Sequence, residues 1–423
     1  IFKNIVVLLI NIFQTKFTSS LSIKLSLRLY DQYLSIPLSL FSKINSATFL
    51  RNTNAEVFLF VRYVITSILL VLSDITLIVF FVILLSFTVS SKAILVLIFF
   101  SIVAYLIYLP NKGKIRNLGI NRTKISENIL QFLKEGLESL REIKLYSIKD
   151  YFINRYKNES EKIIPLTVVI GIISTLPRII IEVIAVVVFS IIIFFTIKLD
   201  KSFTDFIPEL TIFLLCIYRI TPGVSRILQN FQTMKHYMPS FYIIKNIIKD
   251  HESKINEVKK ENHEKINFQK ISLTNVSFKY EDEVILENIN FELKKKSKIL
   301  ISGKSGSGKS TLLDLITGFQ KPAMGKIFLN DKEVLKNEFE QIFSNISYVS
   351  QSPFFLDSDV ISNIAIGQKE KVKESNLTKI VEILKLVQLE EFAENILNKK
   401  NVNLGERAKL ISGGQKQRLA IAR

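Results

Sequence analysis

Long apolar stretches alternate with charged segments over the first 230 residues, and most have the length of membrane-spanning helices. The apolar stretches are Ile1–Phe13, Val61–Phe87, Ala93–Leu109, Ile163–Ile197 and Phe206–Leu228. A helix needs about 20 apolar residues to cross a hydrocarbon core of about 30 Å. The second, fourth and fifth stretches are therefore predicted to span, Ala93–Leu109 is marginal, and the first is too short.

The basic residues of the loops predict which side of the membrane each loop faces. The loop from Pro110 to Lys162 holds twelve Lys or Arg residues, whereas the loops near Lys92 and over Lys198–Asp205 hold one and two. Lys and Arg collect in cytoplasmic loops, so we place the long loop, residues 14–60 and everything after about residue 230 in the cytoplasm. Residue 1 then lies outside and is Ile, which suggests a six-helix domain whose first helix is missing.

The two long cytoplasmic segments are expected to be helical. Residues 123–156 place apolar side chains at helical spacing, with charges on the opposite face; these are Ile125, Ile129, Phe132, Leu133, Leu137 and Leu140. Such helices would carry the spans well into the cytoplasm. The alternative is that they are ordinary surface helices.

Composition excludes several classes of protein. The net charge of +18 could indicate nucleic-acid binding, but Lys and Arg cluster beside the apolar segments, as in membrane proteins. Cys216 is the only cysteine, so one chain can form neither a disulfide nor a thiolate metal site. His236, His251 and His263 show no ligand spacing, and we interpret them as packed or solvated.

The chain after residue 250 has the composition of a soluble domain. A charged linker over 251–266 leads to strand patterns over 270–280 and 285–302. The second pattern runs through an apolar strand at 298–301 into GKSGSGKST, and a helical pattern follows. A glycine, four residues and then Gly-Lys-Ser between a strand and a helix is the phosphate-binding loop pattern. The alternative is a glycine-rich turn that arose by chance, and such a turn would not require a strand before it and a helix after it.

Each residue type in this loop suits a nucleoside triphosphate. The glycines let backbone N–H groups turn inward at the positive end of a helix. Lys309 neutralises phosphate charge, the Ser310 hydroxyl is suited to Mg²⁺, and Thr311 adds a second hydroxyl. The residues expected to bind ATP here are Gly303, Ser305, Gly306, Ser307, Gly308, Lys309, Ser310 and Thr311.

Three further segments carry a family resemblance. VSFKY at 276–280, YVSQSPFFLDSDVISNIAIG at 348–367 and LGERAKLISGGQKQRLAIAR at 404–423 make residues 267–423 resemble the nucleotide-binding domain of an ABC transporter. The resemblance implies ATP and Mg²⁺ as cofactors, Tyr280 stacked on adenine, and Gln351 near Mg²⁺ and the attacking water. It also implies a signature formed by Ser412, Gly413, Gly414 and Gln415. Ile411 replaces the usual leucine at a packing position.

In this family the signature completes the ATP site of another subunit. The resemblance therefore implies a homodimer, or pairing with a paralogous half-transporter. It also implies that a Mg²⁺-binding aspartate, a catalytic glutamate and a later histidine follow the signature, and the sequence stops before them. We expect this chain to bind ATP and to hydrolyse it poorly or not at all.

The order of the two parts resembles the exporter type of ABC protein. It implies an α-helical transmembrane domain over 1–250 and an α/β P-loop domain over 267–423, with the latter in the cytoplasm of a multi-pass bacterial inner-membrane protein. Residues Ser46–Asn54 and Glu135–Lys144 are expected to couple the two, against the segment that contains Gln351.

Charged residues within the spans suggest a substrate. Arg178, Arg219 and Arg226 would each cost about 2.5–3.5 kcal/mol at mid-bilayer, so we expect them to face a cavity. A structural pair with Glu182 is the alternative for Arg178, and a position at the cytoplasmic boundary is the alternative for Arg226. Asp74 has no partner that the sequence identifies.

Clustered guanidinium groups suit phosphate or pyrophosphate. Residues 174–189 and 211–232 also resemble helices of bacterial flippases for lipid-linked oligosaccharides. The leading hypothesis is an ATP-driven flippase of a polyprenyl-pyrophosphate-linked glycan, with membrane lipid and no nucleic acid as further partners. The alternatives are an exporter of lipids, drugs or peptides, and a membrane-anchored ATPase regulator that transports nothing.

Overall fold

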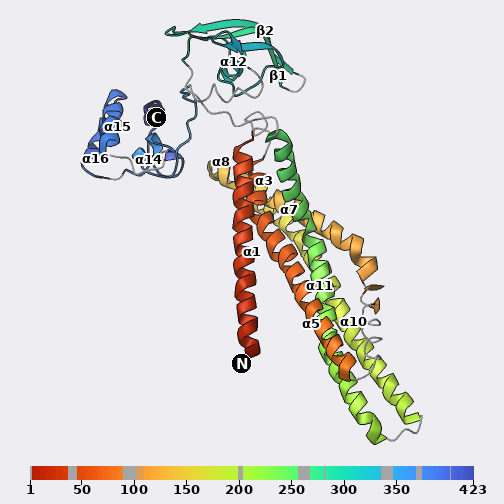
Figure 1. The fold of residues 1–423 in the computed structure, drawn as a ribbon. Coiled ribbons are helices and arrows are strands. Elements are labelled where there is room, and N and C mark those ends of the chain that lie inside the picture. Colours follow the sequence, from red (N-terminus) through yellow and green to blue (C-terminus); the bar gives the residue numbers. More distant parts are fainter. Residues whose placement is uncertain are drawn as a thin grey trace. The chain divides into compact units, whose positions relative to one another are not determined.

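The chain forms two compact units, residues 1–260 and 261–423 (Figure 1). This computed structural model describes residues 2–36, 45–88, 102–103, 105–106, 108–198, 203–255, 267–280, 283–334, 346–367, 374–400 and 402–423. The predicted stretch Ala93–Leu109 lies largely outside these residues. His263 and the side chains of Cys216, Arg219 and His251 lie outside them too.

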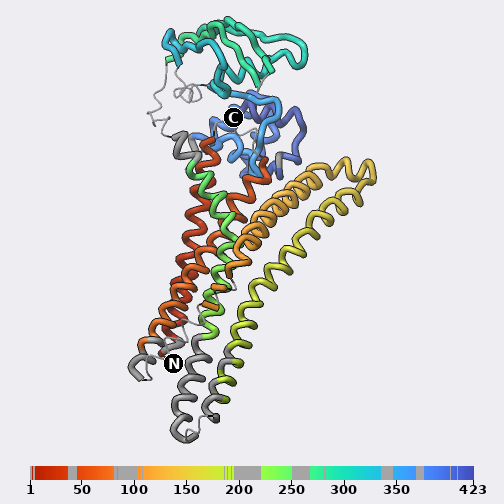
Figure 2. The backbone as a smooth tube through the Cα atoms, turned by 90° about the vertical axis from the view of Figure 1, so that its right-hand side faces the viewer, coloured from red at the N-terminus to blue at the C-terminus, as the bar shows by residue number. Residues whose placement is uncertain are grey.

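The first unit is built from long helices. Its elements are α1 (Phe2–Leu34), α3 (Ser46–Leu50), η1 (Arg51–Glu56), α4 (Val57–Leu59), η2 (Phe60–Ile65), α5 (Thr66–Thr88), η3 (Leu109–Asn111), α7 (Lys112–Glu138), α8 (Leu140–Tyr146), α9 (Lys149–Glu161), α10 (Ile163–Lys198) and α11 (Phe203–Ile255). Helix α11 packs along α5 and α7, and α7 runs beside α9 and α10 (Figure 2).

By length and composition, the described residues contain three helical segments able to cross a membrane. They are Ile5–Leu34, Ser46–Phe80 and Lys149–Ile191. The expectation that the first apolar stretch is too short was wrong, because α1 continues past Phe13 as one helix of 33 residues. Serine and threonine interrupt the apolar run there without ending the helix. The stretch Phe206–Leu228 lies within α11.

The helical prediction for residues 123–156 is confirmed, but the structure divides the segment. Helix α7 ends at Glu138, α8 covers Leu140–Tyr146, and α9 begins at Lys149. Ser147 has a φ of 55°, in the left-handed region that ends helices. The end of the expected apolar stripe is exposed, with Leu137 at 69% and Leu140 at 50%.

Small apolar clusters hold the helices together. Leu29 of α1, Val57 of α4, Val61 of η2 and Ile244 of α11 are buried in one cluster. The turns η1 and η2 are π-helical, a widened form that is frequent at functional sites.

The second unit combines a small sheet with helices. Its elements are β1 (Lys270–Tyr280), β2 (Glu283–Lys294), α12 (Lys309–Ile316), β3 (Met324–Leu329), β4 (Lys332–Glu333), α14 (Val360–Ile364), α15 (Glu374–Leu386), α16 (Glu390–Leu397), η4 (Glu406–Ala408) and α17 (Gly413–Ala422). The sheet is antiparallel with strand order β2-β1-β3-β4. Its core contains Leu273, Val276 and Ile327, and Leu315 of α12 packs into it.

The strand expected at 298–301 is absent from the sheet of described residues. Leu300 is 89% exposed. A strand forms only where a neighbour pairs with its backbone, and within the described ranges no strand lies beside this segment. The helix predicted after the loop is present as α12.

Candidate functional site

The glycine-rich loop turns sharply into α12. Gly306 and Gly308 have φ values of 82° and 81°, which glycine adopts without steric cost. A Cβ atom on Gly308 would lie 2.8 Å from Cδ2 of Leu286, so the loop also packs closely against β2. The first N–H groups of α12 have no partner within the helix, and with the helix dipole they favour an anion.

The Lys309 side chain folds back over this loop. Its ammonium group donates hydrogen bonds to the carbonyl oxygens of Gly303 at 2.9 Å and Lys304 at 2.7 Å. The charge is thereby held at the loop, and Ser305, Gly306 and Ser307 around it are exposed. A lysine held at the mouth of an exposed N–H loop suits the phosphates of a nucleotide.

The two hydroxyl groups at the start of α12 lie in different environments. Ser310 is exposed, as a Mg²⁺ ligand must be, whereas Thr311 is only 8% exposed. Thr311 therefore belongs to the face of α12 that packs toward the core beside Leu315, and its expected role in ATP binding stays a prediction. No hydrogen bond joins Gln351 to Ser310 within the described residues; Gln351 is exposed in the irregular segment before α14.

Tyr280 ends β1 and keeps an exposed ring. The ring is 45% exposed and meets the Phe278 ring edge-on, with centroids 4.9 Å apart. Phe278 pairs across the sheet with Leu286, the residue that Gly308 approaches. The sheet register therefore places the aromatic end of β1 near the glycine-rich loop, which suits a stacked base.

The signature forms the start of α17. The Ser412 hydroxyl accepts a hydrogen bond from the N–H of Gln415 at 3.2 Å, and the Gln415 side chain accepts one from the N–H of Ser412 at 2.8 Å. This capping box starts the helix, and Gly413 and Gly414 in its first turn are exposed and have no side chains. Ile411 packs against the helical core, which confirms its expected packing role. The result is a second exposed helix start suited to phosphate.

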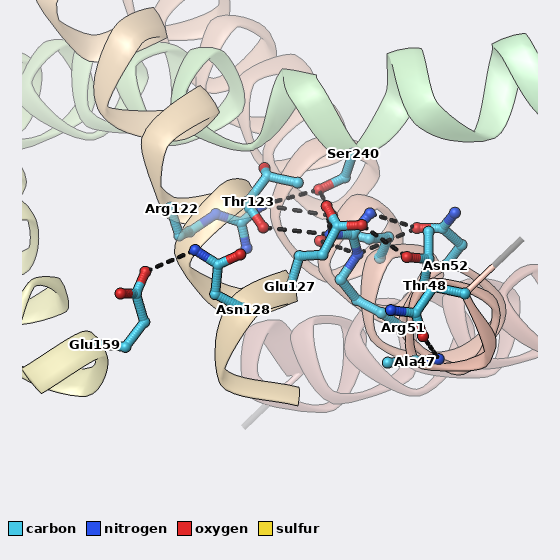
Figure 3. A network of polar contacts seen from close by, with 12 residues as sticks. Ala47, Thr48, Arg51, Asn52, Arg122, Thr123, Glu127, Asn128, Glu159 and Ser240 are labelled. Atoms are coloured by element: carbon cyan, nitrogen blue, oxygen red, sulfur yellow. Dashed lines mark hydrogen bonds and ion pairs between the residues drawn. The ribbon is translucent and has the colours of Figure 1, made fainter. Parts of the chain in front are cut away.

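The segment expected to couple the units carries a buried polar network (Figure 3). Arg51 donates to Glu127 of α7 at 2.7 Å, and Thr48 donates to the other oxygen of the same carboxylate at 2.7 Å. Burial favours the neutral acid, but these two hydrogen bonds and the Arg51 charge outweigh it and lower the pKa of Glu127. α3 and η1 are therefore held firmly to α7.

The network continues into α11 through residues that sequence reasoning did not identify. Glu56 is 1% exposed and accepts hydrogen bonds from the Ser240 hydroxyl and, at 3.5 Å, from Arg122. The guanidinium of Arg122 also lies 4.7 Å from the centre of the Tyr237 ring. A glutamate this deeply buried needs such partners. The sequence feature that could have predicted this network is therefore Glu56, a charged residue just before an apolar run.

The second expected coupling segment, Glu135–Lys144, spans the end of α7 and most of α8. Glu135 forms an ion pair with Arg155 of α9 at 2.7 Å. The Arg155 guanidinium also lies 4.0 Å from the centre of the Phe132 ring. The pair therefore ties α7 to α9 just before the break at Ser139.

Two of the arginines that the sequence places within the spans, Arg178 and Arg226, have carboxylate partners. Arg178 bonds Glu182 on the same helix at 2.8 Å, the structural pair that was the alternative. Arg226 forms three hydrogen bonds with Asp74 of α5, the shortest at 2.6 Å, and so identifies the partner of Asp74. Arg219 lies in α11, and its side chain is outside the described residues. Of the two arginines whose side chains are described, each thus pairs with a carboxylate on its own or a neighbouring helix.

Comparison with known proteins explains why a unit of long apolar helices and a unit with a glycine-rich loop occur in one chain. The model of the ABC transporter transmembrane region matches residues 1–220, and the ABC transporter model matches residues 286–423. The chain belongs to the ABC transporter family. It is a membrane protein with transmembrane helices followed by an ABC ATPase domain that binds ATP, and the predicted fold class is confirmed.

Relatives of this ABC protein match along most of the chain. It is 26% identical over 428 residues to the heterocyst differentiation ATP-binding protein HepA of a Nostoc species, covering 98% of this chain and 67% of the relative. It is 25% identical over 413 residues to an ATP-dependent lipid A-core flippase of Francisella tularensis, covering 93% and 64%. The chain thus spans about two thirds of these relatives.

A solved structure has the same fold. The structure of a bacterial Atm1-family ABC exporter with ATP bound matches with a TM-score of 0.79 at 17% identity, over 97% of this chain and 72% of that one. At this level of identity the match concerns the fold alone. It agrees with the exporter-type order of domains inferred from the sequence.

Proposed function

We propose that the whole protein is an ATP-driven exporter that works as a dimer. The observation that carries the proposal is the presence, in one ATPase domain, of two exposed helix starts: the glycine-rich loop at α12 and the Ser412-capped start of α17. Each can hold phosphate oxygens. Two copies facing head to tail would enclose each nucleotide between one loop and the partner's signature, as a homodimer or with a paralogous half-transporter.

Hydrolysis, with Mg²⁺ on Ser310 and Gln351 beside the attacking water, would separate the two domains. The network of Thr48, Arg51 and Glu127 supports the next step, because it joins the cytoplasmic ends of the helices into one body that can move as a unit. The bacterial inner membrane is the proposed location.

For the substrate we propose a lipid-linked glycan carried on pyrophosphate. The lipid A-core flippase among the relatives supports a lipid substrate, and Arg219, whose side chain lies outside the described residues, stays a proposed partner of the pyrophosphate. The pairing of Arg178 and Arg226 with carboxylates favours a second candidate, an exporter of other lipids, drugs or peptides, because it removes two of the three proposed charges.

Photolabelling with azido-ATP tests the nucleotide site. Lys309→Ala should weaken labelling about 10- to 100-fold, because it removes charged hydrogen bonds to phosphate worth about 1.5–3 kcal/mol. Lys321→Ala removes an exposed lysine beyond α12 and serves as the matched control. Equal labelling of the Lys309 and Lys321 variants would contradict the proposed site.

Transport is tested separately in vesicles that contain the protein. ATP should move a fluorescent polyprenyl-pyrophosphate sugar between leaflets, and Arg219→Gln should slow that movement while azido-ATP labelling stays unchanged. Movement of hydrophobic drugs but not of the sugar lipid would favour the second candidate. No movement of any substrate would support the non-transporting alternative.

A further inference from the structure

A groove separates α1 from the segment that runs from α4 through η2 into α5. It encloses about 500 Å³. Six residues of α1 with amide or hydroxyl groups line one side: Asn11, Gln14, Thr15, Thr18, Ser19 and Ser22. Phe58, Val61, Arg62, Thr66 and Leu70 line the other side.

The polar lining is a continuous stripe of one helix. Positions 11, 15, 19 and 22 recur at helical spacing, so their side chains share one face of α1. The Thr18 hydroxyl donates to the carbonyl oxygens of Gln14 at 2.9 Å and Thr15 at 3.1 Å. The side chains of Thr15, Ser19 and Ser22 make no hydrogen bond with any described residue. Their hydroxyls are available to a ligand.

Arg62 supplies the positive charge of the groove. Within the described residues it forms neither an ion pair nor a hydrogen bond, in contrast to Arg51, Arg178 and Arg226. It lies in the π-helical turn η2, where the Thr66 hydroxyl donates to the carbonyl of Val61 at 3.1 Å. An arginine without a carboxylate, facing a row of hydroxyls, is suited to an anion with several acceptor oxygens.

The position of the groove indicates that the anion carries an apolar tail. Arg62 lies at the start of the apolar stretch Val61–Phe87, and the α1 stripe follows the apolar stretch Ile1–Phe13. On each side the polar residues of the groove thus adjoin an apolar stretch of the same helix. Beyond the groove, in the membrane direction, Leu9 is 58% exposed and Leu72 is 56% exposed. A tail could lie along these side chains while its head enters the groove.

We propose that this groove binds the phosphate or pyrophosphate head of an amphiphile, with Arg62 pairing with the phosphate oxygens and the α1 hydroxyls donating to them. The proposal rests on the proposed export function and adds Arg62 and the α1 hydroxyls to Arg219 as residues that recognise its substrate. No nucleotide is needed for this binding.

Protection of a single cysteine tests the site. Cys216→Ser removes the only cysteine, and Leu70→Cys adds a reporter to the groove wall without removing a proposed hydroxyl donor. The rate of N-ethylmaleimide labelling is then measured, without ATP, in the presence of farnesyl pyrophosphate, farnesol or inorganic pyrophosphate. Farnesyl pyrophosphate should slow labelling on the order of 10-fold, and the two half-molecules should do so only weakly at equal concentration.

Charge variants in the same background identify the partner of the head group. Arg62→Gln should raise the half-protecting concentration of farnesyl pyrophosphate about 10-fold or more, since a charged hydrogen bond is lost, and Arg62→Lys should raise it less. Lys16→Gln removes a charge from an exposed position of α1 outside the groove and should leave it unchanged.

Three results would overturn the proposal. Equal protection by inorganic pyrophosphate would indicate a site for free anions, equal protection by farnesol would indicate an apolar site, and unchanged protection in Arg62→Gln would remove the assigned partner. The comparison of the three probes does not depend on any charge variant folding. If farnesyl pyrophosphate protects the cysteine but the vesicles show no ATP-driven transport, the groove site is supported and only the proposed export function is contradicted.

Discussion

Replacing Gly119 with alanine should disrupt the contact between α7 and α11. A Cβ atom at this position would lie 2.0 Å from the carbonyl oxygen of His236 and 3.3 Å from Cγ of Pro239. The first of these atoms is backbone, so no side-chain rotation can relieve the clash. The two helices must separate by roughly 1 Å to restore an ordinary contact.

The size of the effect follows from two opposing terms. Overpacking a close contact costs about 1–3 kcal/mol, and a backbone clash belongs at the upper end. Alanine returns up to about 1 kcal/mol through its helix propensity. The net destabilisation should be about 2 kcal/mol, which corresponds to a melting temperature about 4–8 °C lower for a unit of this size.

Thermal unfolding in detergent, followed by circular dichroism, measures this effect. Gly136→Ala is the matched control in the same helix, since the nearest atom to its Cβ is a Phe152 side-chain carbon at 3.7 Å, an ordinary contact. It should melt at the same temperature or slightly higher. If Gly119→Ala melts with Gly136→Ala, the close approach of α7 and α11 is refuted.

Two further predictions concern buried polar groups. Burial, with the nearby Arg122 charge, lowers the pKa of His236 from 6.5 to about 4, so folding favours the neutral imidazole. The contribution of neutral His236 to the free energy of unfolding is complete above pH 6.5 and falls by about 2 kcal/mol by pH 5. Between pH 6.5 and pH 5 the melting temperature should therefore fall less in His236→Asn than in the unchanged protein. Parallel curves of melting temperature against pH would contradict the lowered pKa of His236. Asp74→Asn and Arg226→Gln should each destabilise the helices, and the double variant should lose about 1–3 kcal/mol less than their sum. Additive losses in urea unfolding would show that the pair contributes no coupling.

The residues proposed to bind the nucleotide could be predicted because each motif is formed by residues close together in the sequence. A phosphate loop needs glycines, a lysine and a hydroxyl at fixed spacing, and Lys309 and Ser412 occupy the helix starts that the sequence indicated. The prediction of a strand at 298–301 was wrong for the described residues, because a segment forms a strand only where a neighbouring strand pairs with its backbone. The sequence places Thr311 beside Ser310 at the start of α12, but only the turn of the helix decides which hydroxyl faces the core, and Thr311 is 8% exposed.

The sequence by itself determined the order of a helical membrane domain and an ATP-binding domain, and with it the family, because apolar length and short motifs depend on neighbouring residues. Only the tertiary structure decided that Arg226 meets Asp74, that Glu56 receives Arg122 and Ser240, and that Arg62 faces a row of hydroxyls. These partners lie on different helices. Helix packing decides which side chains become partners. The periodicity of one helix predicts its own apolar face but not the face of the other helix that packs against it.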